Sequence, residues 1–370
     1  MANVFDYLDW RGDLPFSAAP FSPPDNLILC CLSYVHFGGI AGGVGEEPVS
    51  LAHAAELFAV SGEEKERVRV PSDGELLKKA AKTRRFADLR LCRYVSRLDF
   101  EEEKQFAAVT FLLPDGSVYA AFRGTDSTLV GWKEDLNMSF LESVPAQEDA
   151  LAYLKDTAVR CPGPLRTGGH SKGGNLAVYA ASLAPQAVQD RLLAVYNNDG
   201  PGFSGDLLRR PGSRRIADRV HTFVPQSSIV GMLLEHDEDY LVIRSSGAGL
   251  MQHDPYSWEI LGPDFVRLES VTQGSRLVDR TLKDWLAGLE PGDRRGFIDS
   301  LYEILSSTNA VSLGDLSTGR LKNALAMLEA SNRLSREEKA RLSHALSLLL
   351  ASARKNLLSA LPGQSAGRLP

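Results

Sequence analysis

The stretch that decides the fold reads Gly168-Gly169-His170-Ser171-Lys172-Gly173-Gly174-Asn175-Leu176-Ala177. It holds the pattern Gly-x-Ser-x-Gly, centred on Ser171. A β-like run at 165–167 precedes it, and a helix-forming stretch at 176–183 follows it. Glycines leave room for crowded backbone where a serine sits on a tight strand-to-helix turn. The sequence therefore predicts a nucleophile elbow that directs the Ser171 hydroxyl into a cleft.

Outward from this turn, short apolar runs alternate with helix-period segments. The apolar runs lie at 165–169, 193–198, 219–224 and 240–245, and the helical segments lie at 128–139, 146–160 and 173–185. This alternation predicts a largely parallel sheet with helices on its faces. Two β-rich runs, 105–113 and 117–123, flank Pro114-Asp115-Gly116, so they predict a hairpin.

Both ends of the chain differ from this central part. Residues 1–25, rich in Pro and aromatics, predict an extended wrap over the core, and Asp25 is expected to cap an apolar helix over 25–37. Further helices are expected at 49–60, 73–85, 275–289, 292–307, 315–330 and 334–359. We therefore expect a mainly helical part over 1–100, a catalytic core over 101–272 and a helical cap or tail over 273–370.

Composition excludes several classes of protein. The 370 residues are 44% hydrophobic and 24% charged, with a net charge of −6, which does not fit a disordered, fibrous or nucleic-acid-binding chain. No apolar run is long enough to span a membrane, and the first residues do not resemble a leader. A soluble, cytoplasmic protein is expected, whose basic, amphipathic C-terminal part packs as a cap. Peripheral contact of this part with a membrane surface is the less favoured alternative.

The four cysteines, Cys30, Cys31, Cys92 and Cys161, show neither metal-ligand spacing nor a disulfide pattern. We therefore expect free thiols and no metal or organic cofactor.

Three blocks of this sequence resemble the α/β-hydrolases, specifically the class 3 (fungal-type) lipase group and a related bacterial branch. They are Ala-Phe-Arg-Gly-Thr-Asp at 121–126, Gly-His-Ser-Lys-Gly-Gly at 169–174, and the segment around His253. The resemblance covers roughly residues 100–260. It implies an α/β-hydrolase fold with a mostly parallel central sheet flanked by helices, and it implies a bacterial source. The N- and C-terminal helical parts are additions to that fold.

The first block implies half of an oxyanion hole. The backbone N–H groups of Thr125 and of Lys172, the residue after the nucleophile, are then the expected oxyanion donors. Lys172 departs from the aliphatic residue usual in the family, and its side chain is expected to be exposed at the start of a helix. Arg123 is expected to pair with an acid such as Asp135 beneath the hole.

A histidine must activate the serine, and in this fold the chain order is serine, acid, histidine. The histidines after Ser171 are His221, His236, His253 and His344. His253 is the best candidate, because it lies just past the expected strand 240–245 and a glycine-containing loop, where the family's base is placed. His236 lies in an acidic cluster and His344 on the last helix.

The acid is less well defined. The resemblance implies an aspartate near position 228, which is Ser228 here. Asp199, at the end of the preceding expected strand, is the preferred acid. A serine-assisted or dyad arrangement is an alternative, and the weaker candidates are Asp254, Glu235 and Asp237.

The predicted function is a serine ester hydrolase of lipase or carboxylesterase type. Ser171 would form the acyl-enzyme, His253 would be the general base and Asp199 would orient it. The partner would be an acyl ester or lipid-like small molecule. The alternative is a catalytically silent α/β-hydrolase fold that binds or scaffolds a partner, because position 228 lacks an acid and Lys172 is unusual. The sequence does not decide the oligomeric state.

Overall fold

The computed structural model describes residues 1–43, 45–126, 128–138, 141, 143–203, 205–234, 239–308 and 320–360. The chain divides into two compact units, Met1–Val271 and Thr272–Pro370. The three-part division at residues 100 and 272 stays a prediction. Among the described residues, no helix combines the length and the apolar character needed to cross a membrane.

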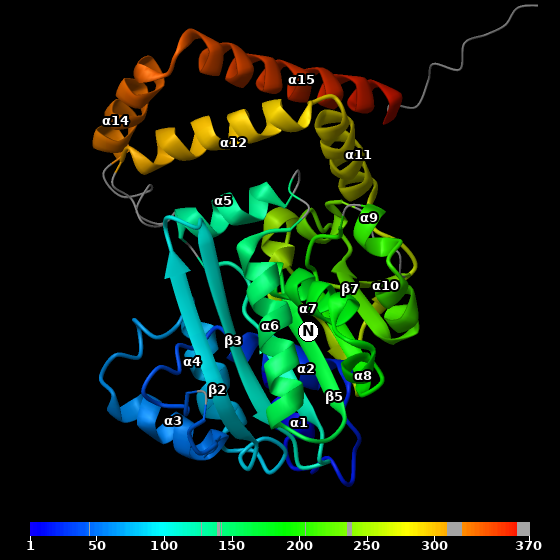
Figure 1. Cartoon of the computed structure of the whole chain (residues 1–370). Coiled ribbons are helices and arrows are strands. Elements are labelled where there is room, and N and C mark those ends of the chain that lie inside the picture. The colour runs from blue at the N-terminus through cyan, green and yellow to red at the C-terminus, as the bar shows by residue number, and fades with distance from the viewer. Residues whose placement is uncertain are drawn as a thin grey trace, which may run out of the picture. The chain divides into compact units, whose positions relative to one another are not determined.

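The described part of the first unit is built on a nine-stranded sheet with the order β1-β2-β3-β4-β5-β6-β7-β8-β11 (Figure 1). Its strands are β1 (Val49–Ser50), β2 (Arg90–Asp99), β3 (Lys104–Leu112), β4 (Val118–Phe122), β5 (Leu165–His170), β6 (Leu192–Asn198), β7 (Val220–Pro225), β8 (Tyr240–Ile243) and β11 (Arg267–Leu268). A separate two-stranded sheet pairs β9 (Ile260–Leu261) with β10 (Asp264–Phe265).

The sheet is mixed, so the prediction of a mostly parallel sheet is wrong. Strands β4 to β8 run parallel to one another, but β1 to β4 and the β8–β11 pair are antiparallel. One cause is β2, which lies in a region predicted to be mainly helical. Its sequence Arg-Leu-Cys-Arg-Tyr-Val-Ser-Arg-Leu-Asp carries three arginines, which hide the strand pattern.

The predicted hairpin is confirmed as β3 and β4. The two strands pair antiparallel, with Leu112 opposite Val118 next to the turn. Gly116 has φ 80°, a value that glycine adopts without steric cost, and Asp115 Oδ1 accepts the Ser117 N–H at 2.9 Å. This turn fixes the register that brings the end of β4 to the candidate site.

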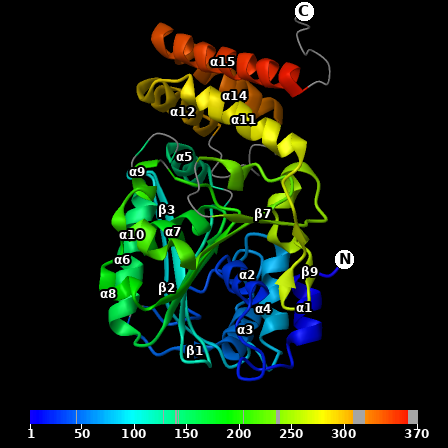
Figure 2. The same ribbon diagram turned by 90° about the vertical axis from the view of Figure 1, so that its right-hand side faces the viewer.

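Helices cover both faces of the sheet (Figure 2). One face carries α1 (Val4–Arg11), α2 (Pro23–Leu32), α3 (Leu51–Val60) and α4 (Pro71–Ala80), and the other carries α6 (Pro145–Arg160), α7 (Lys172–Leu183), α8 (Gln186–Gln189) and α10 (Pro211–Ile216). Strand β4 alternates between the two cores. Tyr119 packs with α2, and Phe122 packs with α6 and α7. The sheet is therefore buried on both sides.

The first 32 residues correct two predictions. Residues 4–11 form α1, with an Asn3–Asp6 capping box, where an extended wrap was expected. Helix α2 begins at Pro23 with Ser22 as its N-cap. Asp25 is therefore the third residue of that helix, not its cap, and it accepts the Ser22 N–H at 2.8 Å. Prolines suit the first helical turn, which accounts for the earlier start.

The first unit also contains the helices α5 (Leu129–Asn137) and α9 (Gly205–Leu208) and the 3-10 helices η1 (Ala217–Arg219), η2 (Val230–Met232), η3 (Gly249–His253) and η4 (Pro255–Ser257). The second unit contains α11 (Gln273–Ala287), α12 (Pro291–Ser306), α14 (Arg320–Arg333) and α15 (Arg336–Ala360).

Within the second unit, α15 packs on α11. The rings of Trp285 and Phe297 are T-shaped to each other, with their centroids 5.6 Å apart. Trp285 Nε1 donates to the carbonyl of Ala345 at 2.8 Å. Helices are therefore present in all four regions where they were predicted, although residues 315–319 of one prediction lie outside the described residues.

Candidate functional site

Ser171 occupies the turn between β5 and α7. Its backbone has φ 59° and ψ −134°, a combination that a non-glycine residue adopts only at a cost in free energy. Its N–H donates to the carbonyl of Asn198, the last residue of β6, at 2.9 Å. A strained residue on a strand-to-helix turn is the geometry expected of a nucleophile elbow.

Three glycines make room for this turn. A Cβ on Gly169 would lie 2.2 Å from the Gly173 backbone, and one on Gly173 would lie 2.2 Å from a carbonyl oxygen of β4. A Cβ on Gly124 would lie 2.4 Å from the His170 carbonyl oxygen and 3.1 Å from Ser171 Cβ. Larger residues would therefore push the segment after β4 away from Ser171.

The predicted base and acid are hydrogen-bonded to each other. His253, the last residue of η3, places Nδ1 2.7 Å from Asp199 Oδ2. Asp199 is fully buried, whereas 27% of the His253 side chain is exposed. An ionised carboxylate only accepts, so Nδ1 carries a proton and Nε2 of the neutral ring is left as the acceptor.

Ser228 holds the same carboxylate from the loop where the resemblance implied an aspartate. Its Oγ donates to Asp199 Oδ1 at 2.5 Å, and the Gly231 N–H donates to that oxygen at 3.2 Å. Asp199 itself has φ 55°, which aspartate tolerates better than most residues. The sequence leaves Asp199 and a serine-assisted arrangement as alternatives. In the structure, Ser228 and Asp199 are hydrogen-bonded to each other.

His170 and Tyr34, to which no role was assigned from the sequence, support His253. The rings of His170 and His253 lie 4.6 Å apart, and His170 Nε2 lies 2.8 Å from the His253 carbonyl oxygen. A carbonyl only accepts, so Nε2 donates. Burial lowers the pKa of His170 well below its usual value, and the nearby His253 lowers it further, so Nδ1 accepts from the Tyr34 hydroxyl at 2.9 Å. His170 lies within the quoted serine motif, but no sequence pattern points to Tyr34.

Several polar groups around Ser171 have no hydrogen-bond partner among the described residues. They are the Ser171 hydroxyl, His253 Nε2, and the backbone N–H groups of Thr125 and Lys172. The first N–H groups of a helix lack intrahelical partners, which accounts for Lys172. The structure thus shows no Ser171–His253 hydrogen bond, and it leaves the two predicted oxyanion donors available.

Lys172 is buried, so the expectation of an exposed side chain is wrong. Only 1% of its side chain is exposed, and Nζ donates to Glu134 Oε2 and to two oxygens of Gln105, each at 2.9 Å. Glu134 also accepts the N–H groups of Gln105 and Ala146. A buried ammonium requires such partners, and they come from β3 and α5, which the local motif does not reveal.

Arg123 does not pair with Asp135, which corrects another expectation. Arg123 Nη2 lies 3.6 Å from Asp126 Oδ2, and Asp135 Oδ2 accepts from Thr125 Oγ1 at 2.5 Å. Burial raises the pKa of Asp135 to about 6, although the charge of Lys172 and the Thr125 hydrogen bond oppose the rise. Its Oδ1 atom is buried and has no hydrogen-bond partner among the described residues.

The other candidates lie elsewhere. His221 stacks on Tyr196, and burial lowers its pKa. His344 is exposed on α15, and Asp254 caps η4 through the Tyr256 N–H. His236, Glu235 and Asp237 fall outside the described residues.

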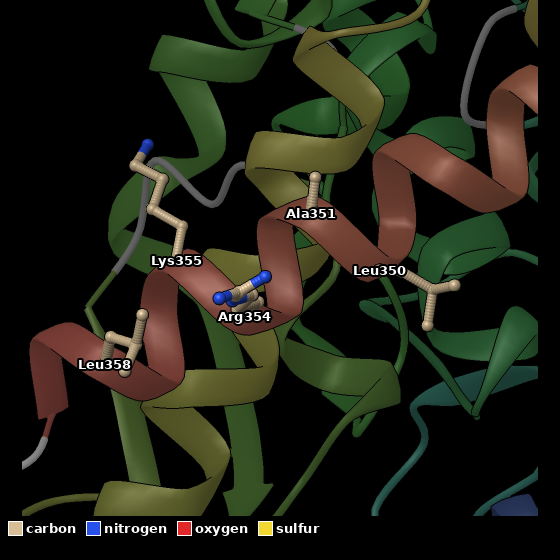
Figure 3. A pocket seen from close by; sticks show the side chains of 5 residues that line it. All are labelled: Leu350, Ala351, Arg354, Lys355 and Leu358. Carbon is tan, nitrogen blue, oxygen red and sulfur yellow. The ribbon is translucent and has the colours of Figure 1, made fainter.

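An open cavity of about 410 Å³ lies along α15 (Figure 3). It is lined by Leu350, Ala351, Arg354, Lys355 and Leu358, none of them a predicted site residue. Within the described part of the chain, no group of three or more His, Cys, Asp or Glu side chains is placed to hold a metal ion.

Residues 80–303 match the Mbeg1-like family, so the chain belongs to that family. A search of curated proteins finds no match to this chain.

Similar solved structures include three lipases. The M37 lipase is 14% identical, with a TM-score of 0.36, and the match covers 57% of this chain and 70% of that one. The Rhizomucor miehei lipase, in a propeptide complex, is 16% identical (TM-score 0.34; 52% and 63% covered). A triacylglycerol lipase from Penicillium expansum is 12% identical (TM-score 0.30; 50% and 75% covered). These scores are too low to transfer an activity or a residue role.

Proposed function

We propose that this protein is a serine ester hydrolase of lipase or carboxylesterase type, acting on acyl esters or lipid-like small molecules. The observation that carries the proposal is the strained Ser171 turn beside the Asp199–His253 pair, in which the carboxylate is fully buried. A strained backbone persists only where surrounding structure enforces it, which is typical of functional sites. The match to the Mbeg1-like family does not identify the acyl group of the substrate.

The proposed reaction begins at the Ser171 hydroxyl. His253 Nε2 takes its proton as Oγ attacks the ester carbonyl, and Asp199 stabilises the imidazolium through Nδ1. The negative charge on the carbonyl oxygen is stabilised by the N–H groups of Thr125 and Lys172. One such donor is typically worth about 3 kcal/mol of barrier.

The second half of the reaction uses the same groups in reverse. The imidazolium of His253 protonates the departing alkoxide, which leaves an acyl-enzyme on Ser171. Nε2 then takes a proton from water, and the hydroxide attacks the acyl carbon to release the acid. Every proton in this scheme passes through Nε2, so the base must be neutral before attack.

Three buried side chains, Ser228, Tyr34 and His170, support this arrangement without a direct role in the reaction. Ser228 fixes one oxygen of Asp199, so the other faces His253. The Tyr34–His170 relay holds the His253 carbonyl in place. Both restrict the imidazole to one orientation, and proton transfer requires that.

Hydrolysis of p-nitrophenyl esters of increasing chain length tests the proposal. Wild type should turn over at least part of the series, and Ser171→Ala should fall to the uncatalysed rate. Ser182→Ala, on the same helix but away from the site, is the matched control and should retain activity. If the folded wild type and Ser171→Ala are equally inert, the silent binding or scaffolding fold replaces the enzyme.

A further inference from the structure

Two cysteines from distant parts of the chain meet on the sheet face that α6 covers. Cys92 of β2 lies opposite Thr110 of β3 in antiparallel register. Side chains of directly opposed residues point to the same face of a sheet. The Thr110 hydroxyl lies 2.7 Å from the hydroxyl of Tyr153 on α6. Cys92 therefore faces α6.

Helix α6 presents a stripe of three residues to this face, namely Tyr153, Thr157 and Cys161. They are spaced four apart, so they lie in a row along the helix. Tyr153 donates to the Arg93 carbonyl at 3.1 Å, and Thr157 Oγ1 accepts from Arg93 Nε at 3.3 Å. Cys161 follows as the C-cap at the next position of this row, which brings its thiol to the sheet face that Cys92 occupies.

The surroundings make the two thiols unequal. The Cys92 S–H donates to Cys161, and this bond lowers the pKa of Cys161 to about 6, helped by the charges of Arg93 and Arg191. The same hydrogen bond, together with burial, raises the pKa of Cys92. A thiolate is the reactive form of cysteine. Cys161 is thus poised as the nucleophile and Cys92 as its proton-bearing partner.

Access separates this pair from the other thiols. Cys161 is partly exposed, whereas Cys92 is 4% exposed and Cys30 and Cys31 are fully buried. Burial raises the pKa of both Cys30 and Cys31. A reagent in solution therefore meets Cys161 before any other cysteine of the chain.

We propose that Cys92 and Cys161 form a redox-active dithiol that takes a small-molecule disulfide such as oxidised glutathione. The Cys161 thiolate attacks one glutathione sulfur, an S–S bond breaks, and one glutathione leaves as thiolate. The Cys92 thiol then loses its proton and attacks Cys161 Sγ, which releases the second glutathione. The two protein thiols are oxidised to one disulfide, and oxidised glutathione is reduced to two thiols.

The first test uses the native full-length protein. It is incubated with oxidised glutathione, alkylated, denatured, alkylated again with a reagent of different mass, and analysed by peptide mass spectrometry. The proposal predicts a mass loss of two hydrogens and a linked Cys92–Cys161 peptide, with Cys30 and Cys31 alkylated only after denaturation. Separate alkylation of Cys92 and Cys161, or a lasting glutathione adduct on wild-type Cys161, would overturn it.

Two single substitutions assign the roles. Cys92→Ser should accumulate one glutathione on Cys161, because no second thiol can displace it. Cys161→Ser should leave Cys92 unmodified. Glutathione on Cys92 in the second variant, or none on Cys161 in the first, contradicts the assignment. Ser171→Ala should oxidise like wild type, because this inference does not rest on the proposed hydrolysis.

Discussion

Two buried polar networks in the first unit differ in how completely they are satisfied. In the N-terminal network, Arg85 donates all five of its N–H groups, two to Asp25 and three to the carbonyls of Leu14, Ala19 and Pro20. Both Asp25 oxygens also accept from other groups, including the Tyr7 hydroxyl at 2.9 Å.

The network around Ser171 is not closed in this way. Its supporting groups are paired, as Asp199 with Ser228 and His253 shows. The groups that would face a substrate have no partner among the described residues: the Ser171 hydroxyl, His253 Nε2 and two backbone N–H groups. Buried polar side chains alone therefore do not mark a functional site. Hydrogen-bonding groups that lack a partner, held in place by residues whose own hydrogen bonds are satisfied, are the better indication of such a site.

Removing the support of the open network should have the largest effect. Asp199→Asn replaces the carboxylate that, in the proposed reaction, stabilises the imidazolium and fixes the tautomer of His253. Ester hydrolysis should fall by about 10⁴-fold in kcat, as for loss of a triad acid. Asp254→Asn, the adjacent alternative acid, is the control and should lose little. Steady-state kinetics on one ester measure both, and the reverse ranking would contradict the assignment.

Breaking the closed network should instead cost stability. Arg85→Met leaves the buried Asp25 carboxylate without its cation, which should lower the free energy of unfolding by about 3–5 kcal/mol. Denaturant titration measures this change. Arg84→Met, at an exposed neighbouring position, should change it little. A large loss of kcat in Arg85→Met that remains folded would remove the distinction between the two networks.

Asp135, at the edge of the open network, should make stability depend on pH. Its pKa of about 6 in the folded chain exceeds the unfolded value of about 3.9. The contribution of Asp135 to the free energy of unfolding is therefore fully present below about pH 4 and is lost as the pH rises through 6. The change should be on the order of 1–3 kcal/mol. Unfolding titrations from pH 4 to 7 should show a weaker pH dependence for Asp135→Asn. Identical slopes in wild type and variant would contradict the raised pKa.

The smallest effect is expected at Tyr34, which contacts His253 only through His170. Tyr34→Phe removes the donor to His170 Nδ1, which should lower kcat about tenfold or less, equivalent to about 1 kcal/mol. KM should stay unchanged, because Tyr34 acts through His170 and not on substrate. Tyr196→Phe is the control, since its buried ring makes no side-chain hydrogen bond to a described residue. Equal effects of the two variants would leave Tyr34 without a positioning role.

Local motifs predicted what lies close to them in the chain. The Gly-x-Ser-x-Gly pattern located the turn at Ser171, and Pro-Asp-Gly located the β3–β4 hairpin, because short-range sterics decide both. Chain order together with the resemblance to the α/β-hydrolases selected His253 and Asp199, which the structure brings together. Their roles in catalysis stay a prediction.

Features that depend on distant partners were missed. Lys172 looked exposed because its acceptors come from β3 and α5, far away in the sequence. Strand β2 was missed because arginines interrupt its pattern, and one of them, Arg93, pairs with Asp156 on α6. The thiol pair joins residues 69 positions apart, so no spacing rule reveals it.

The most direct test of the central claim is covalent labelling of the native chain with a fluorophosphonate, followed by peptide mapping. We expect one adduct, on Ser171, formed rapidly in wild type and more slowly in Asp199→Asn, because only an activated serine attacks the phosphonate. Ser171→Ala should take up no label. Labelling of another serine, equal labelling of Ser171→Ala, or no adduct on folded wild type would contradict the claim.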